Sequence, residues 1–293
     1  MEKNKVDFRD QISRNKWKSF FLLSIIFLVF IALGYVISFA FSPGYFFIIM
    51  IISIIFSLGY ILISYYNSGS IAIKSVNAKK ASREKHKQFY DLVEGLKISS
   101  GIPMPKLYVM ESPQINAFAS GRNPENAVVC ITTGALEKLD KKELEGVLAH
   151  ELGHIANFDI RYMTVATVVV GLVSIISEIY LHSLWFSHGG NDNKNWIFIL
   201  LGILLAILAP IIVRLVQFAI SRKREYNADA SAVKFTRYPR GLIGALRKIK
   251  TENQIPNKNV SSAIAPLFFS NPLNNLASTH PPLEKRISIL ERM

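Results

Sequence analysis

The chain has 293 residues, of which 50% are hydrophobic and 19% charged, with a formal net charge of +13 and a single cysteine. The charged share lies below the roughly 25% that is typical of soluble domains. A disulfide-stabilised secreted domain is excluded because Cys130 has no partner in the chain. Disorder is excluded because this many apolar residues can form a core. A membrane protein or an unusually apolar enzyme remains.

Much of the hydrophobicity is concentrated in four runs of 22, 21, 22 and 25 residues. Each is long enough, at about 1.5 Å per helical residue, to cross a hydrocarbon core of about 30 Å. Among the 55 charged residues, only Glu178 and Arg214 lie within these runs. The runs cover residues 20–41, 46–66, 163–184 and 196–220.

The spacing of the runs predicts two transmembrane hairpins. The short turn at 42–45 makes residues 1–66 a basic N-terminal segment followed by the first hairpin. Residues 163–220 are expected to form the second, although buried soluble helices can be equally apolar. Six Lys and Arg residues precede the first run and six lie in 67–87, whereas the turn has none. The positive-inside rule therefore places both termini on the cytoplasmic face of the cell membrane.

The positive charge is explained by this topology rather than by a nucleic-acid partner. Much of it lies beside the ends of the predicted spans, where it suits anionic lipid headgroups. The sequence contains no recognisable nucleic-acid-binding module. We therefore expect the membrane and protein substrates as partners, and no nucleic acid. The oligomeric state is left open.

A helix is predicted to begin after Asp140, because Glu143 three residues later is typical of a capping box. Apolar residues then recur at helical spacing as far as residue 155. This helix carries the pattern His-Glu-x-x-His at His150, Glu151 and His154. Multiplying residue frequencies gives roughly 0.006 such patterns by chance in a chain of this composition, which favours a functional origin.

The spacing of this pattern suits metal-dependent hydrolysis. Residues four apart project from one helix face, so the imidazoles of His150 and His154 can reach the same ion. Zn²⁺ accepts such nitrogens at about 2.0–2.1 Å. Glu151 lies beside the ion rather than on it. There it can take a proton from water and pass it to a leaving amine.

A catalytic zinc ion needs a third protein ligand and an open position. Among the other histidines, His182 and His188 are predicted on the opposite side of the membrane, and His86 lies in a basic run. Glu225 follows the fourth run on the same side as the histidine pair, and Asp229 comes four residues later on a presumed helix. One of these carboxylates is expected to bind the metal and the other to orient a ligand imidazole.

These segments together resemble the HtpX family of membrane zinc metalloproteases over nearly the whole chain. The similar segments are residues 116–119, 150–154, 225–229, 278–282 and 283–286. The resemblance implies a gluzincin-type endopeptidase with one zinc ion held by His150, His154 and Glu225. It makes Glu151 the general base and places Asp229 behind a ligand imidazole.

The resemblance has further implications beyond the metal ligands. It implies proteolytic quality control in the stress response, with cleavage of damaged or misfolded membrane proteins from the cytosolic side. It also implies self-cleavage. His280 becomes an expected hydrogen-bond donor to the oxyanion that develops in the reaction. Arg286 is expected to support it and to lie, like Asp229, behind the metal ligands.

Apolar, β-branched runs at 106–110 and 127–132 predict a small β-sheet beside the histidine-bearing helix, with a turn at 121–126. An edge strand there is expected to pair with an extended substrate through main-chain hydrogen bonds. The substrate-binding residues predicted in this way are Asn116, Ala117 and Phe118. Cys130 is expected to be a core residue rather than a ligand.

The sequence therefore predicts a predominantly helical α+β membrane protein with four transmembrane helices and a cytosolic gluzincin-like protease domain. That domain is divided between residues 67–162, with the His-Glu-x-x-His helix, and 221–293, with the third ligand. A CAAX-type prenyl-protein protease is an alternative, but such enzymes resemble longer chains with more spans. A catalytically silent metal-binding scaffold is another, but it would have no use for Glu151.

Overall fold

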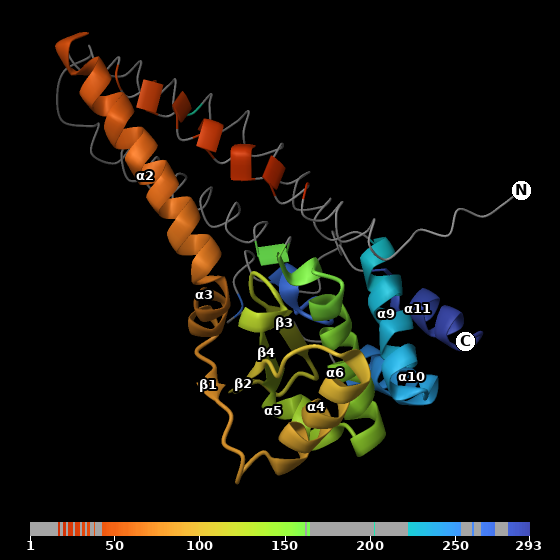
Figure 1. Cartoon of the computed structure of the whole chain (residues 1–293). Coiled ribbons are helices and arrows are strands. Elements are labelled where there is room, and N and C mark those ends of the chain that lie inside the picture. Colours follow the sequence, from red (N-terminus) through yellow and green to blue (C-terminus); the bar gives the residue numbers. More distant parts are fainter. Residues whose placement is uncertain are drawn as a thin grey trace, which may run out of the picture. The chain divides into compact units, whose positions relative to one another are not determined.

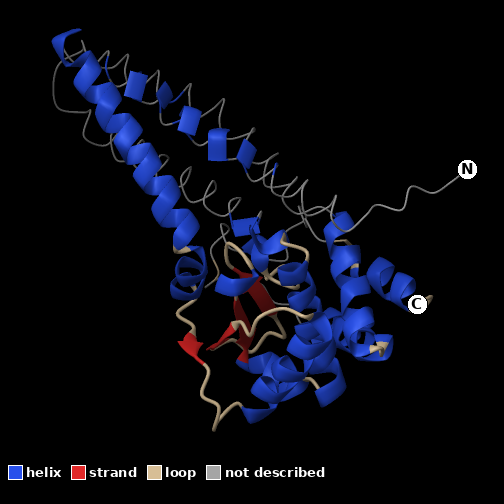
Figure 2. Ribbon diagram, in the orientation of Figure 1, coloured by secondary structure: helices blue, strands red, loops and turns tan. Residues whose placement is uncertain are grey.

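The computed structural model describes residues 43–161, 163–164, 222–252, 260, 265–272 and 281–293, with residue 202 and scattered residues between 17 and 38. The chain divides into two compact units, which are residues 1–16, 67–164 and 220–293, and residues 17–66 and 165–219. The described residues are mostly helical and include a small mixed β-sheet (Figures 1 and 2). This agrees with the predicted helical content and small β-sheet, whereas the four predicted transmembrane helices stay a prediction.

Helix α2, Phe46–Tyr66, forms most of the described part of the unit made of residues 17–66 and 165–219. It coincides with the second predicted run and follows a short 3-10 turn at Pro43–Tyr45. Within the described part of the chain, α2 alone is both long and apolar enough to cross a membrane. The third and fourth predicted runs, with Glu178 and Arg214, lie almost wholly outside the described residues, and the first is described only in part.

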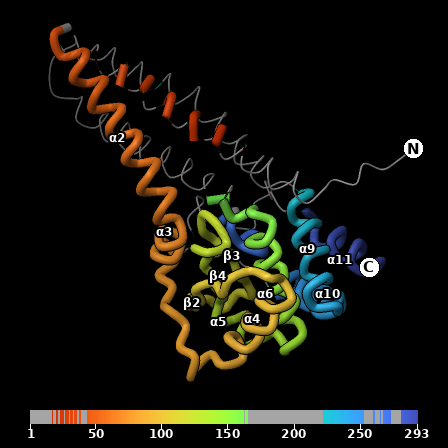
Figure 3. The backbone as a smooth tube through the Cα atoms, viewed as in Figure 1, coloured from red at the N-terminus to blue at the C-terminus, as the bar shows by residue number. Residues whose placement is uncertain are grey.

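A four-stranded sheet lies in the other unit, in the order β1-β2-β4-β3. Figure 3 labels its strands β2, β4 and β3. Strand β1 pairs antiparallel with β2, β2 parallel with β4, and β4 antiparallel with β3. The two predicted strands are confirmed as β2 and β4, whereas β1 was not predicted. The strands are Lys79–Lys80, Lys106–Met110, Ala117–Ser120 and Val128–Thr132 for β1 to β4.

Both faces of this sheet are covered, so β3 and β4 are buried along their whole length. One face contributes Val129 and Ile131 to a core shared with α4, Lys87–Ser100, and with the histidine-bearing helix α6. The opposite face contributes Phe118 and Cys130 to a second core, which includes Phe268 and residues of α3, Ser68–Ser75. Cys130 is therefore a core residue, as predicted, and burial raises the pKa of its thiol.

Helix α6, Lys141–Ala156, begins at the predicted position. The Asp140 side chain accepts hydrogen bonds from the amides of Lys142 and Glu143, at 2.7 and 2.9 Å. The Glu143 carboxylate accepts the Asp140 amide in return, at 2.9 Å. This capping box fixes where the helix starts, and so fixes which face carries the histidines.

Helices α9, Arg222–Thr236, α10, Pro239–Glu252, and α11, Leu283–Leu290, complete the domain around α6. Shorter elements are α3, Ser68–Ser75, α5, Thr133–Lys138, and the 3-10 turns η2, Pro124–Asn126, and η5, Ala265–Leu267. Helix α10 approaches α6 closely because Gly146 and Gly241 have no side chains. A Cβ on Gly146 would lie 2.6 Å from the Leu242 amide nitrogen.

The substitution Gly146→Ala is expected to destabilise the domain by about 1–3 kcal/mol, because overpacking a tight interface forces the backbones apart. Gly95→Ala on α4 is the matched control, since nothing lies within 4 Å of a Cβ there. Removing a helical glycine at such an open position stabilises a protein by about 0.4–1 kcal/mol. Thermal unfolding in detergent should move the two variants in opposite directions. A Gly146→Ala midpoint at or above that of the original chain would contradict the close approach.

Candidate metal centre

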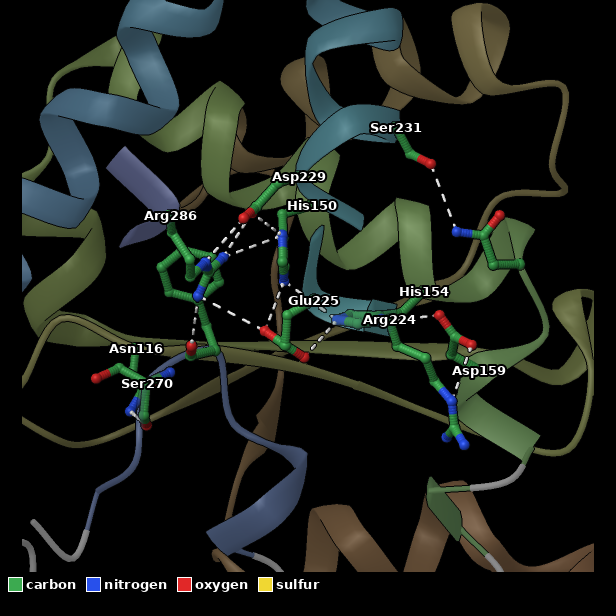
Figure 4. A network of polar contacts seen from close by, with 12 residues as sticks. Asn116, His150, His154, Asp159, Arg224, Glu225, Asp229, Ser231, Ser270 and Arg286 are labelled. Atoms are coloured by element: carbon green, nitrogen blue, oxygen red, sulfur yellow. Dashed lines mark hydrogen bonds and ion pairs between the residues drawn. The ribbon is translucent and has the colours of Figure 1, made fainter. Parts of the chain in front are cut away.

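Helices α6 and α9 bring together the three predicted ligands (Figure 4). His150 and His154 stand one helical turn apart on α6, and Glu225 lies in the first turn of α9. The helices approach closely at Gly153, where a Cβ would lie 3.2 Å from the Ala228 carbonyl oxygen. One ligand atom from each of the three residues lies within 4.8 Å of the others, and all three residues are buried.

A chain of contacts extends behind His150. Its Nδ1 donates to Oδ1 of Asp229 at 2.9 Å, which leaves the Nε2 lone pair facing Glu225. Arg286, fully buried, donates from Nη2 and Nε to the two Asp229 oxygens at 2.6 and 2.9 Å. Burial alone would raise the pKa of Asp229, but Arg286 and His150 hold this pKa below its ordinary value. Asp229 thus remains a carboxylate.

A similar chain of contacts extends behind His154, and the sequence interpretation missed it. His154 Nδ1 donates to Oδ2 of Asp159 at 3.2 Å. The other oxygen of Asp159 lies 3.8 Å from Nε of Arg224, and both groups are buried. Burial alone would lower the pKa of His154, but Asp159 and Glu225 raise this pKa to about 9. The carboxylates around His154 therefore favour positive charge at this position, which a bound metal ion would supply in place of the imidazole proton.

The spacing of the ligand atoms fits a small tetrahedral ion. His150 Nε2 and His154 Nε2 lie 3.1 Å apart, and each is the nitrogen that does not face its aspartate. A proton on one of these nitrogens makes the contact a hydrogen bond, and a metal ion in place of that proton would be bound by both lone pairs. The distances from these nitrogens to the nearer Glu225 oxygens are 3.6 and 3.5 Å. Ligands at about 2.0–2.1 Å from a tetrahedral zinc ion would be about 3.3–3.4 Å apart.

The charges of this cluster lead to the same conclusion. Among the described residues it contains four buried carboxylates and two buried guanidinium groups, which with neutral imidazoles give a surplus of two negative charges. Buried charge is costly unless it is balanced, and one divalent cation would balance it. The charged residues are Glu151, Asp159, Glu225 and Asp229, with Arg224 and Arg286.

Glu151 is buried beside the ligands without being one of them. Neither of its carboxylate oxygens has a hydrogen-bond partner at bonding distance, although the nearby main chain of Ala119 stabilises the charged form. Burial raises the pKa of Glu151 above its ordinary value, against the opposing effect of the two histidines. A carboxylate with raised pKa and no bonds to break is suited to accept and return a proton.

The predicted substrate-binding residues contact another part of the chain in this structure. Asn116 forms two hydrogen bonds with the main chain of Ser270, at 2.8 and 3.1 Å. The Ala117 carbonyl accepts the Phe269 amide at 2.8 Å, and the rings of Phe118 and Phe268 pack together. A substrate strand can pair at these positions only if Phe268–Ser270 leaves. Substrate binding by residues 116–118 stays a prediction.

Of the two residues predicted to act on the oxyanion, only Arg286 lies in the described part of the chain. His280 lies outside the described residues. Arg286, which was expected to support it, contacts Asp229 and the Phe269 carbonyl, and its guanidinium also lies 3.6 Å from Glu225. Its described contacts are therefore with residues of the metal centre, where it was grouped with Asp229, and its support of His280 stays a prediction.

Two histidines and a glutamate around one point, with a buried carboxylate beside them, define the class of protein as a metallopeptidase. Residues 83–293 match the family model of peptidase family M48. Protease HtpX homologues from Dictyoglomus thermophilum and Caldanaerobacter subterraneus are each 41% identical, over 98% and 96% of this chain and 95% and 96% of their own lengths. One from Listeria monocytogenes is 39% identical over 97% of this chain and 99% of its own.

The chain therefore belongs to peptidase family M48 and, within it, to the HtpX family of membrane metalloproteases. This confirms the resemblance drawn from the sequence, and nearly complete coverage of HtpX homologues favours it over the CAAX-type alternative. The fold is shared with Saccharomyces mikatae Ste24p, whose crystal structure matches with a TM-score of 0.54 and 21% identity, over 96% of this chain and 66% of that one.

Proposed function

We propose that the chain hydrolyses peptide bonds with one zinc ion held by His150, His154 and Glu225, and with Glu151 as the general base. The observation that carries the proposal is the spacing of the donor atoms. The two Nε2 atoms lie 3.1 Å apart, and those of His150 and His154 lie 3.6 and 3.5 Å from Oε2 and Oε1 of Glu225. Each histidine keeps its Nε2 lone pair for the ion because its Nδ1–H donates a hydrogen bond to an aspartate. The absence of sulfur from the ligand set is compatible with a His₂Glu catalytic zinc site.

When bound, zinc supplies a Lewis acid that polarises the scissile carbonyl and makes water more acidic. Glu151 accepts the proton of the attacking water, and its raised pKa favours holding that proton until the C–N bond breaks. It returns the proton to the nitrogen of the leaving amine as that bond breaks. The main chain of Ala119 stabilises the Glu151 carboxylate before the first transfer and after the second. Asp159 and Asp229 keep both imidazoles oriented throughout.

Removal and return of metal tests this function. Purified full-length protein treated with a chelator is expected to lose cleavage of an unfolded protein such as casein, and stoichiometric Zn²⁺ is expected to restore it. Mg²⁺ is expected not to restore it, because Mg²⁺ prefers octahedral oxygen ligands to imidazole. Cleavage that survives chelation, with no zinc in the sample, would contradict the proposal.

We also propose that the four apolar runs span the cell membrane and that the metal centre faces the cytoplasm. The distribution of Lys and Arg supports this orientation. Ser42→Cys and Ser187→Cys are expected to react with a membrane-impermeant maleimide in intact cells, whereas Ser99→Cys should react only after lysis. Native Cys130 adds little background because it is buried. Labelling of Ser99→Cys in intact cells would contradict this orientation and place the catalytic domain outside the cell.

A further inference from the structure

The metal centre has two similar arms, and only one of them was expected. In each, an aspartate accepts a hydrogen bond from the Nδ1 of a ligand histidine, and an arginine faces that aspartate. The first arm is His150, Asp229 and Arg286, and the second is His154, Asp159 and Arg224. We propose that Asp159 is a positioning residue for His154, with Arg224 as its counter-charge, and that this arm joins α6 to α9 beside the metal centre.

The end of α6 is shaped to present Asp159 to His154. The helix ends at Ala156, Asn157 caps it, and Phe158 then adopts a left-handed conformation with φ of 58°. A bulky residue with positive φ is uncommon and costs free energy, so surrounding contacts must hold the turn. The turn returns Asp159 to the side of the helix that carries His154, where Asp159 is fully buried.

Arg224 reaches the same carboxylate from the other helix. It lies in the first turn of α9, immediately before the ligand Glu225, and 6% of its surface is exposed. A buried carboxylate needs a compensating charge, and the 3.8 Å separation between Arg224 Nε and Asp159 Oδ1 provides it. The second arm therefore joins the ligand His154, through Asp159, to Arg224, which precedes the ligand Glu225 in the chain. It connects α6 to α9 through side chains rather than through the metal alone.

Asp159 and Arg224 also occupy special positions in the sequence, next to the predicted second hairpin. Asp159 lies four residues before the third apolar run begins at residue 163, and Arg224 four residues after the fourth run ends at residue 220. The ion pair therefore joins the two points at which the chain leaves and re-enters the catalytic domain. The first arm has no such position, because Arg286 comes from α11 near the C-terminus. The second arm should accordingly control how firmly α6 and α9 hold the ion.

The inference rests on the proposed metal centre, and zinc affinity tests it without reliance on activity. Affinity is measured by competition with a chelator, in full-length protein that also carries Glu151→Gln so that it cannot cut itself. Asp159→Asn keeps the shape and removes the charge, and it is expected to weaken Zn²⁺ binding by about 10–100-fold, as for other residues behind metal ligands. Asp91→Asn, an exposed aspartate on α4 paired with Lys87, is the matched control and should bind zinc unchanged.

The role of Arg224 is tested by coupling. Arg224→Gln should weaken zinc binding less than Asp159→Asn does, and Arg224→Lys should recover most of the loss. If Arg224 acts through Asp159, the double variant binds zinc no more weakly than Asp159→Asn alone. Losses that add in full would show that Arg224 acts independently. Should Asp159→Asn fail to fold, Arg224→Gln and Arg224→Lys carry the test, and equal affinities for the two would contradict it.

Two results distinguish a failure of this inference from a failure of the proposed function. If Asp159→Asn lowers the unfolding midpoint of the metal-free protein but leaves zinc affinity equal to that of Asp91→Asn, Asp159 is merely structural and the inference is overturned. If the parent protein itself binds no zinc, the proposed function fails instead. The two failures are therefore distinguishable within one series of measurements.

Discussion

Replacement of Glu151 by Gln is expected to abolish proteolysis and leave the metal centre filled. The amide has nearly the shape of the carboxylate but cannot accept a proton, and loss of general-base catalysis typically costs about 10²–10⁴-fold in rate. Zinc should be retained because Glu151 is not among the three ligand residues. The unfolding midpoint should not fall, since the Glu151 oxygens have no hydrogen bond at bonding distance to lose.

Glu145→Gln is the matched control for this experiment, since it makes the same change on the same helix. Glu145 is paired with Lys142 at the surface and does not approach the ligands. Cleavage of casein and self-cleavage should continue in this variant. Undiminished cleavage by Glu151→Gln would remove Glu151 from the reaction and with it the proposed mechanism.

Replacement of Glu225 by Gln is expected to abolish metal binding as well as proteolysis. The variant loses the carboxylate that faces the Nε2 atoms of both histidines and completes the donor set, whereas Glu151 is not among the ligand residues. Zinc content after gel filtration should fall from one ion per chain to a small fraction, and cleavage should fall in proportion.

The control for this second prediction is Glu111→Gln, because Glu111 pairs with Lys79 at the surface and both side chains are largely exposed. Its zinc content and cleavage should match those of the original chain. If Glu225→Gln retained a full complement of zinc, the third ligand would have to come from elsewhere in the chain. The contrast with Glu151→Gln, which keeps zinc and loses cleavage, separates metal binding from proton transfer.

Local sequence signals were sufficient for the elements that carry the histidines. The capping box at Asp140 and Glu143 and the apolar spacing beyond it placed α6 correctly, because both act within one or two helical turns. Strands β2 and β4 were predicted because each is an apolar run between turns. Helix α2 coincides with a predicted span for the same reason.

Contacts between distant segments could not be predicted from local patterns in the sequence. Asn116 and Ser270 are 154 residues apart, so the pairing that covers the outer edge of β3 left no local signal. The second arm was missed for a different reason. Asp159 lies five residues after His154, and Arg224 immediately precedes Glu225. Charged residues this close to the ligands, beside apolar runs, were a signal that could have been used.

The metal ligands were predicted from chemistry rather than from local structure. The four-residue spacing of His150 and His154 lets both imidazoles reach one ion. The coordination of catalytic zinc then requires a third protein ligand. The choice between Glu225 and Asp229 needed the resemblance to the HtpX family. In the structure Glu225 faces both Nε2 atoms, whereas Asp229 faces Nδ1 of His150. This arrangement is consistent with the proposed roles.

Zinc K-edge X-ray absorption on the purified Glu151→Gln protein tests the central claim most directly. The account predicts one zinc ion with about four nitrogen and oxygen ligands at about 2.0–2.1 Å, two of them imidazoles, and no sulfur. Sulfur at about 2.3 Å would place the ion on Cys130 or on another chain. Six oxygen ligands without imidazole would likewise contradict a centre built from His150, His154 and Glu225.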